Sequence, residues 1–280
     1  GADDGIGIAA GFALLEDPLL RHGPLELLLT LNEEDGMGGA HDLAPGLLQG
    51  RILLNLDGEM ENEVGVGSAG SRRVHFVFKD RAVAPPPGLA WLELKVSGGR
   101  GGHSGGDIHL GRANAINVLL ELLGPEAQYL ILGELGGGSL ANAIAREARA
   151  IVGLPQGRSQ ETGARLAARS SGIVAGFSGT DPGLKVEVAP AAAPGLCLDA
   201  ASSARILKAL AALPDGCFSL LEGLEDVARL SSNLGALATA ALPASDVQGG
   251  EGLAIEGKLL VRAAFDPERI ELVARIETLL

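Results

Sequence analysis

The chain has 280 residues, of which 46% are hydrophobic and 20% charged, a balance typical of a globular protein and not of a disordered one. Its net charge of −13 argues against nucleic acid or an anionic membrane surface as the main partner, because both require basic patches. The two cysteines show no disulfide or metal-binding pattern and no apolar run is long enough to cross a bilayer, so a reducing cytoplasm is the expected setting.

The first part of the chain alternates between helix and strand patterns. Residues 5–15 carry small side chains on one side and larger apolar ones on the other, which is typical of a tightly packed helix. Residues 25–31 and 51–56 are apolar runs of strand length, and residues 38–48 between them indicate a short helix or loop. This alternation predicts an α/β layer with a mainly parallel sheet.

Acidic residues follow or precede these elements. Asp3 and Asp4 stand at the start of the first helix, Glu33 and Glu34 follow the first strand, and Asp57 follows the second. Carboxyl ends of parallel strands share one sheet edge, so these acids are expected to lie together. Neighbouring residues in extended backbone point to opposite sides, so one glutamate could hold a cation while the other handles a water proton. The alternatives are a solvated acidic loop and, at the helix, simple capping.

The rest of the chain has a different character. A glycine-rich stretch at 64–70 and a proline-rich connector at 82–88 separate segments that alternate as half-buried strands. We predict an α+β domain with an antiparallel sheet over residues 73–280, following a first domain over residues 1–72. The expected strands are 74–78, 90–96, 148–154, 184–188 and 253–262, and the expected helices are 114–123, 160–170, 200–213 and 267–280.

Three residues of this second part are candidates for ligand binding. His103 lies in a glycine-rich stretch, residues 98–107, which would leave the imidazole accessible and allow the backbone to approach a ligand. Asn142 lies in a polar turn, and Arg262 ends an expected strand, where its planar fork could clamp a carboxylate. The alternatives are a mobile glycine turn and an ordinary surface ion pair. No G-x-S-x-G or H-E-x-x-H motif is present.

Five motifs in this order resemble the aminoacyl-histidine dipeptidases, also called cytosol non-specific dipeptidases, of the M20 family of di-zinc peptidases. The resemblance extends over nearly the whole chain and is poorest at residues 155–214. The motifs are Gly-Ala-Asp-Asp-Gly-Ile-Gly, Asn-Glu-Glu-Asp-Gly-Met, Leu-Asn-Leu-Asp-Gly-Glu, Gly-Gly-His-Ser-Gly-Gly-Asp-Ile-His and Asn-Ala-Ile-Ala-Arg-Glu-Ala.

The resemblance implies a role for each acid of the first part. Asp3 is similar to the carboxylate that bridges two zinc ions, Glu34 to a terminal ligand of one zinc, and Asp57 to a ligand of the other. Glu33 resembles the general base that deprotonates the metal-bound water. Residues 1–72 would then be part of a zinc-peptidase catalytic domain, with two zinc ions expected in a complete enzyme and manganese or cobalt able to use the same ligands.

The resemblance also implies that residues 73–280 form a lid domain through which the protein dimerises. His103 would reach the carbonyl of a dipeptide substrate, while Asn142 and Arg262 would hold its carboxylate end.

One departure from the family pattern affects the metal centre. The family takes one zinc-binding histidine from an H-x-D motif upstream of the first motif and another from near its C-terminus, and this chain has neither. Asp3, Glu34 and Asp57 would leave an all-carboxylate set, whereas zinc favours nitrogen or sulfur ligands. We therefore expect a fragment that by itself binds zinc weakly and hydrolyses little. Two alternatives remain: a related aminoacylase or carboxypeptidase, and a degenerate, non-catalytic binding or dimerisation protein.

Overall fold

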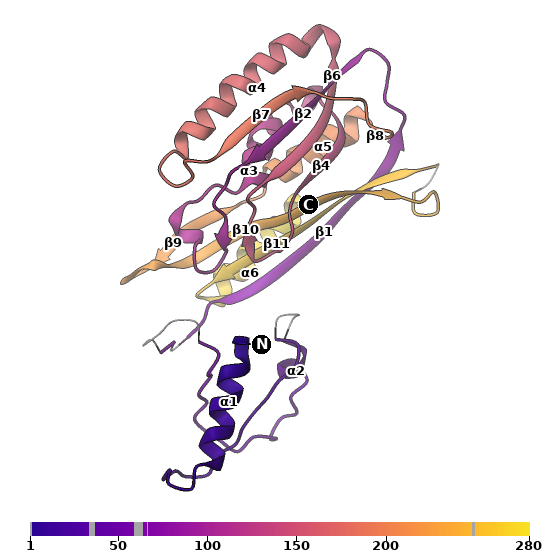
Figure 1. Cartoon of the computed structure of the whole chain (residues 1–280). Helices are drawn as coiled ribbons and strands as arrows, with labels where there is room; N and C mark the ends of the chain where they lie inside the picture. Colours follow the sequence, from indigo (N-terminus) through magenta and orange to yellow (C-terminus); the bar gives the residue numbers. More distant parts are fainter. Residues whose placement is uncertain (1, 34–36, 59–63, 66, 248–249) are drawn as a thin grey trace. The chain divides into compact units, whose positions relative to one another are not determined.

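A computed structural model describes residues 2–33, 37–58, 64–65, 67–247 and 250–280 (Figure 1). The chain divides into two compact units, Gly1–Ser68 and Ala69–Leu280, each described by itself below. The division predicted from the sequence lies four residues later, at 72/73, and the assignment of the two parts to a catalytic and a lid domain stays a prediction.

The first unit contains two helices, α1 (Ala2–Glu16) and α2 (Gly38–His41). Gly7 and Gly11 form the buried side of α1, and a Cβ at Gly11 would clash with the side chain of Leu27, so glycine is needed where the following segment crosses the helix. The Gly39 N–H donates to the carbonyl of Leu31 at 3.0 Å, which ties α2 to the end of that segment.

The parallel sheet predicted for this unit is not formed by its described residues. Among them, up to residue 68, there is no strand, and the apolar runs at 25–31 and 51–56 have no regular structure. Many of their side chains are exposed: Leu31 to 77%, Ile52 to 85% and Leu54 to 79%. The physical reason is that a strand exists only where neighbours accept and donate its backbone hydrogen bonds, and an apolar sequence alone does not supply them.

The second unit is built on a sheet of nine described strands. Their order is β7-β2-β6-β4-β10-β11-β1-β8, with β9 paired to β10, and every recorded pairing is antiparallel, as predicted for this part of the chain. The strands are β1 (Gly70–Val83), β2 (Leu89–Ser97), β4 (Ile131–Gly138), β6 (Ala148–Pro155), β7 (Lys185–Pro190), β8 (Cys197–Leu198), β9 (Gly216–Leu221), β10 (Leu224–Leu242) and β11 (Gly252–Ala263).

Helices pack on this sheet and form the core with it (Figure 1). Helix α3 contacts β2, β4, β6 and β10, and α5 contacts both α3 and β4, so these two helices share one face; α6 packs on β1 and β11, and α4 on β7. The helices are α3 (Ala115–Leu123), α4 (Gln156–Gly176), α5 (Ala200–Ala211) and α6 (Asp266–Leu279), with short 3-10 helices η1 (Ile108–Leu110) and η2 (Gly124–Tyr129). No described helix combines the length and apolar character that a membrane crossing requires.

Helix α3 shows why the sequence folds this way. Ile116, Leu119, Leu120 and Leu123 recur at helical spacing and are all at most 2% exposed. Asn114 caps the helix, since its side chain accepts the N–H of Ile116 at 3.1 Å. The chain as a whole is therefore a mixed α/β protein whose described sheet is antiparallel.

Candidate functional site

His103 and Arg262 lie side by side, although 159 positions separate them in the chain. His103 belongs to β3 (Gly102–His103), which pairs with β5 (Ala143–Ile144), and its Nε2 is 3.4 Å from Nη2 of Arg262 on β11. The Gly106 N–H donates to Nδ1 of His103 at 3.2 Å, and this bond assigns the proton of the neutral ring to Nε2. The Nε2–H of His103 and the Nη2–H groups of Arg262 are then two neighbouring donors, and an anionic oxygen could accept hydrogen bonds from both.

Arg262 is a half-buried cation without a counter-charge. Its Nε is buried and has no hydrogen-bond partner, and its guanidinium forms no ion pair, among the residues that the structure describes. Burial and then the nearby charge of Arg73 lower the pKa of Arg262, yet an arginine stays protonated at neutral pH. Because a buried donor without a partner costs free energy, a bound carboxylate would stabilise this side chain.

Asn142 lies directly beside His103. Its carbonyl accepts the N–H of Ser104 at 2.7 Å, and its neighbour Ala143 is the strand partner of His103. The side-chain amide of Asn142 is half-buried and forms no hydrogen bond to any described residue. The structure therefore brings together the three residues predicted to bind substrate, from a loop, a turn and a strand.

The glycine-rich loop that carries His103 is held at several points and is not a free turn. Asp107 accepts the N–H of His103 at 2.8 Å and forms an ion pair with Arg112 at 3.3 Å, while Arg112 also donates to the carbonyl of Gly101 at 2.7 Å. The carboxylate of Asp181 joins the two ends of the loop by accepting the N–H groups of Arg100 and Ala113, at 2.7 and 2.9 Å. These bonds fix the backbone that carries the imidazole.

Gly105 packs over the pair of side chains. A Cβ at this position would lie 3.0 Å from Cε1 of His103 and 3.2 Å from Cζ of Arg262. A larger residue would therefore displace the imidazole or the guanidinium, which explains a glycine beside the histidine.

The acids predicted to bind metal are only partly described. Glu34 lies outside the described residues, and of Asp3 only its place in α1 is described. Glu33 and Asp57 are exposed; the Asp57 N–H donates to Oδ1 of Asn55 at 3.1 Å, and the carboxylate of Asp4 caps α1 by accepting the N–H of Gly7 at 2.8 Å. No group of three potential metal ligands occurs in the described part of the chain. The predicted cluster of acids thus stays a prediction.

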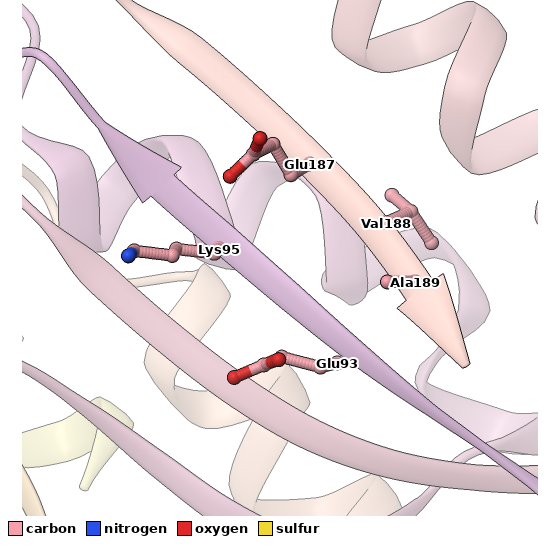
Figure 2. A pocket seen from close by; sticks show the side chains of 5 residues that line it. All are labelled: Glu93, Lys95, Glu187, Val188 and Ala189. Atoms are coloured by element: carbon pink, nitrogen blue, oxygen red, sulfur yellow. The ribbon is translucent and has the colours of Figure 1, made fainter. Parts of the chain in front are cut away.

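Two hollows of the second unit contain none of the predicted site residues. The larger, of about 480 Å³, lies on the exposed face of β2 and β7 and is lined by Glu93, Lys95, Glu187, Val188 and Ala189 (Figure 2). Charged side chains point into it from both strands, and Arg149 links Glu93 to Glu134 on the adjoining strands, so it is a solvated charged surface. The smaller, of about 260 Å³, lies beside α3 and includes Asp215 and Asn114.

Known proteins resemble the chain closely. Over 158 residues it is 45% identical to the cytosol non-specific dipeptidase of Escherichia coli, an alignment that covers 54% of this chain and 32% of that protein. The resemblance to these dipeptidases is confirmed. The crystal structure of aminoacylhistidine dipeptidase from Vibrio alginolyticus superimposes with a TM-score of 0.79 at 32% identity, covering all of this chain and 55% of that one. No protein-family profile matches.

The chain thus spans about a third of the curated dipeptidase and about half of the solved one. Sequence reasoning missed the residues that hold the site, including Asp107, Asp181, Asn114 and Asn233. Asp107 had a detectable signal, because it lies four residues after His103 in the same motif. Asp181 and Asn233 had none, since their partners are distant in the chain.

Proposed function

We propose that the protein hydrolyses dipeptides and that its second unit binds the substrate's carboxylate end. The observation that supports this most strongly is Arg262, a half-buried guanidinium with an unpaired Nε and no acidic partner among the described residues, 3.4 Å from His103. The printed names of the two similar proteins, both dipeptidases, agree with a ligand that is small and carries a free carboxylate.

Each of the three residues has a distinct task in this proposal. Arg262 pairs with the substrate carboxylate, because its planar fork matches two carboxylate oxygens and no carboxylate of a described residue competes for it. The Nε2–H of His103 donates to the carbonyl oxygen of the peptide bond, where negative charge develops during hydrolysis. The unoccupied amide of Asn142 donates to the same oxygen or to the carboxylate.

We further propose that the first unit belongs to a metal-binding catalytic domain and the second to a lid through which the protein dimerises in the cytoplasm. Asp3, Glu34 and Asp57 would be metal ligands, Asp3 as the bridge, and Glu33 the general base. These three carboxylates do not by themselves fit zinc, which prefers nitrogen and sulfur donors, and the described residues hold no group of three ligands. Residues 25–31 and 51–56 would become parallel strands only where other strands pair with them.

The carboxylate-binding role is tested by substitution of Arg262 in the complete, metal-loaded protein. We expect Arg262→Met to lower kcat/KM for a dipeptide by roughly 100-fold, as for loss of one partner of a desolvated charge pair. Arg81→Met is the matched control, since Arg81 is exposed on the neighbouring strand, ten positions after Ser71, the strand partner of Arg262, and it should change kcat/KM by less than about threefold.

A second substrate distinguishes binding from folding. With a dipeptide whose C-terminal carboxylate is replaced by an amide, wild type and Arg262→Met should have similar kcat/KM values, because the paired charge is absent from the substrate. Equal losses on both substrates would contradict carboxylate recognition by Arg262. Carboxylate-dependent binding without any hydrolysis would instead favour the non-catalytic alternative.

A further inference from the structure

Three consecutive carbonyls at the candidate site are each held by a fixed donor. The side-chain amide of Asn233, on β10, donates to the carbonyls of Ala141 and Ala143, both at 2.9 Å. The carbonyl between them, that of Asn142, accepts the N–H of Ser104 at 2.7 Å. The backbone on both sides of Asn142 is therefore fixed, while its own amide remains available for a ligand.

Asn233 is itself held from the opposite side. It is 1% exposed, and its Oδ1 lies 3.4 Å from Nδ2 of Asn114. The two hydrogens of that Nδ2 have closer acceptors, the carbonyl of Leu234 at 3.0 Å and Oδ1 of Asp215 at 3.1 Å, so Asn114 holds mainly the backbone next to Asn233. Asp215 accepts the N–H of Leu234 at 2.7 Å as well. Although residue 215 is only half-buried as a whole, protein atoms enclose its carboxyl group, and this desolvation raises its pKa to about 7. Asn114 and Asp215 thus hold the strand backbone at Leu234, directly after Asn233, and the Asn233 amide in turn holds the turn of Asn142.

The backbone is shaped to admit this connection. Strand β10 has an irregularity in its pairing with β11 at Gly235, between Leu234 and Ala236. A Cβ at Gly235 would overlap the carbonyl oxygen of Leu140 and lie 2.7 Å from Cα of Ala141. The turn that carries Asn142 therefore crosses β10 in direct backbone contact, which places its carbonyls within reach of the Asn233 amide.

We propose that Asn233, anchored by Asn114 and Asp215, is a positioning residue that sets the Asn142 turn for substrate binding. Asn233 does not touch the substrate; it acts through the Ala141 and Ala143 carbonyls and hence through Asn142, which lies between them. This inference rests on the proposed function for its effect on hydrolysis, but its effect on the turn can be measured without substrate.

The chemistry of asparagine suits this task better than that of a residue with fewer donors. Both N–H groups of one amide are used by two carbonyls that flank the working residue, so the turn is gripped on each side. Removal of these donors would leave two half-buried carbonyls without this partner, and the turn would shift to recover water or other donors.

The test compares variants of one strand in the complete protein. Asn233→Leu keeps a similar volume and removes both donors, whereas Asn233→Thr keeps one hydroxyl donor and safeguards the test if the leucine variant does not fold. Thr239→Val is the matched control, because the Thr239 hydroxyl, also on β10, exchanges hydrogen bonds with the backbone of Leu135 at 2.8 and 2.9 Å and is remote from the turn. The variants are compared alone and combined with Asn142→Ala.

We expect Asn233→Leu to lower kcat/KM for a dipeptide by roughly 10- to 100-fold, Asn233→Thr by less, and Thr239→Val by less than about threefold. If Asn233 acts through Asn142, the Asn233→Leu/Asn142→Ala double variant should lie within about threefold of Asn142→Ala alone. Losses that multiply, or equal losses for Asn233→Leu and Thr239→Val at equal thermal stability, would reduce Asn233 to a general structural residue and overturn the proposal.

Hydrogen exchange separates failure of this inference from failure of the proposed function. Asn233→Leu should raise the exchange rate of the Ser104 amide, which donates to Asn142, by at least about tenfold, and Thr239→Val should not. If the wild-type protein hydrolyses no dipeptide, the function is wrong, but this exchange result still supports the positioning role. Unchanged exchange at Ser104 would overturn it whatever the activity.

Discussion

Similar apolar segments are exposed in the first unit and buried in the second. In the first, Leu53 and Leu54 lie in an apolar run and are 77% and 79% exposed, whereas Leu94 and Val96 on β2 of the second are fully buried. The difference is that β2 has β6 and β7 as hydrogen-bonded neighbours and α3 against one face, while residues 51–57 have no described strand beside them. Apolar character gives a strand only where other elements complete it.

The residues of the candidate site differ between the two units in the same way. In the second unit, sheet register and hydrogen bonds bring His103, Asn142 and Arg262 together from distant parts of the chain. In the first, the carboxylates of Glu33 and Asp57 are exposed and form no metal-binding group with other described residues. The predictions below test this contrast, beginning with the largest effect.

Truncation of a core leucine should separate the units most clearly. Leu119→Ala, on α3, removes a fully buried side chain and should lower the free energy of unfolding by about 3 kcal/mol. Leu53→Ala, in the exposed run of the first unit, should change it by less than about 0.5 kcal/mol. Denaturant unfolding followed by circular dichroism measures both. A loss of more than about 2 kcal/mol for Leu53→Ala would show that the first unit has a packed core.

Two glycines should respond to alanine with opposite signs. Gly235→Ala would place a Cβ against the backbone of Leu140 and Ala141, and we expect a loss of about 2 kcal/mol. At Gly5, within α1, nothing lies within 4 Å of an added Cβ, so Gly5→Ala should stabilise this helix by roughly 0.5–1 kcal/mol. Thermal melts of the two variants decide the signs. Stabilisation by Gly235→Ala would contradict the close backbone crossing.

Asp215 should make stability depend on pH near neutrality. The folded protein raises the pKa of this carboxyl from 3.8 to about 7, so between these values the folded state binds more protons than the unfolded state. Its favourable contribution is complete below about pH 4 and is lost as the pH rises to about 7, with a slope of up to about 1.4 kcal/mol per pH unit. Arg112 and Glu121 line the same hollow and are the charged groups that share it.

Asp215→Asn keeps an acceptor for Leu234 and Asn114 and removes the titration. Unfolding free energies measured from pH 5 to 8 should therefore fall less steeply for the variant than for wild type. Identical slopes would show that Asp215 does not titrate in this range.

Metal removal should have the smallest effect. A metal that binds only the folded state raises stability, and the described residues contain no group of three ligands. We therefore expect a chelator or added zinc to shift the melting temperature of residues 1–280 by less than about 1 °C, since all-carboxylate sites hold zinc weakly. A decrease of several degrees on chelation would indicate a metal centre already assembled in the first unit.

Local pattern predicted part of the fold, and long-range pairing decided the rest. The spacing of Ile116, Leu119, Leu120 and Leu123 predicted α3 correctly because one helix face alone carries that information. The 19-residue β10 was missed, since its alanines, serines and glycine have little strand propensity and its place between β4 and β11 comes from its neighbours. The strands predicted at 25–31 and 51–56 were wrong for the converse reason. Their sequences have strand propensity, but no described strand pairs with them.

For the candidate site, too, local motifs predicted residues, whereas long-range pairing decided their geometry. His103 and Arg262 could be proposed from their motifs, but not their 3.4 Å approach, which depends on the β3–β5 pairing and the position of β11. Asn233 could not be proposed at all, because a polar residue within a strand sequence gives no sign of the two carbonyls, 90 and 92 positions away, that it binds.

The central claim, that the second unit recognises a substrate carboxylate, is tested most directly by nuclear magnetic resonance. Residues 1–280 would be titrated with a dipeptide and, separately, with the same dipeptide ending in an amide. We expect shifts at the amides of His103 and Asn142 and at Nε of Arg262 with the dipeptide, and much weaker ones with its C-terminal amide. Equal shifts with both ligands, or none at these three residues, would contradict it.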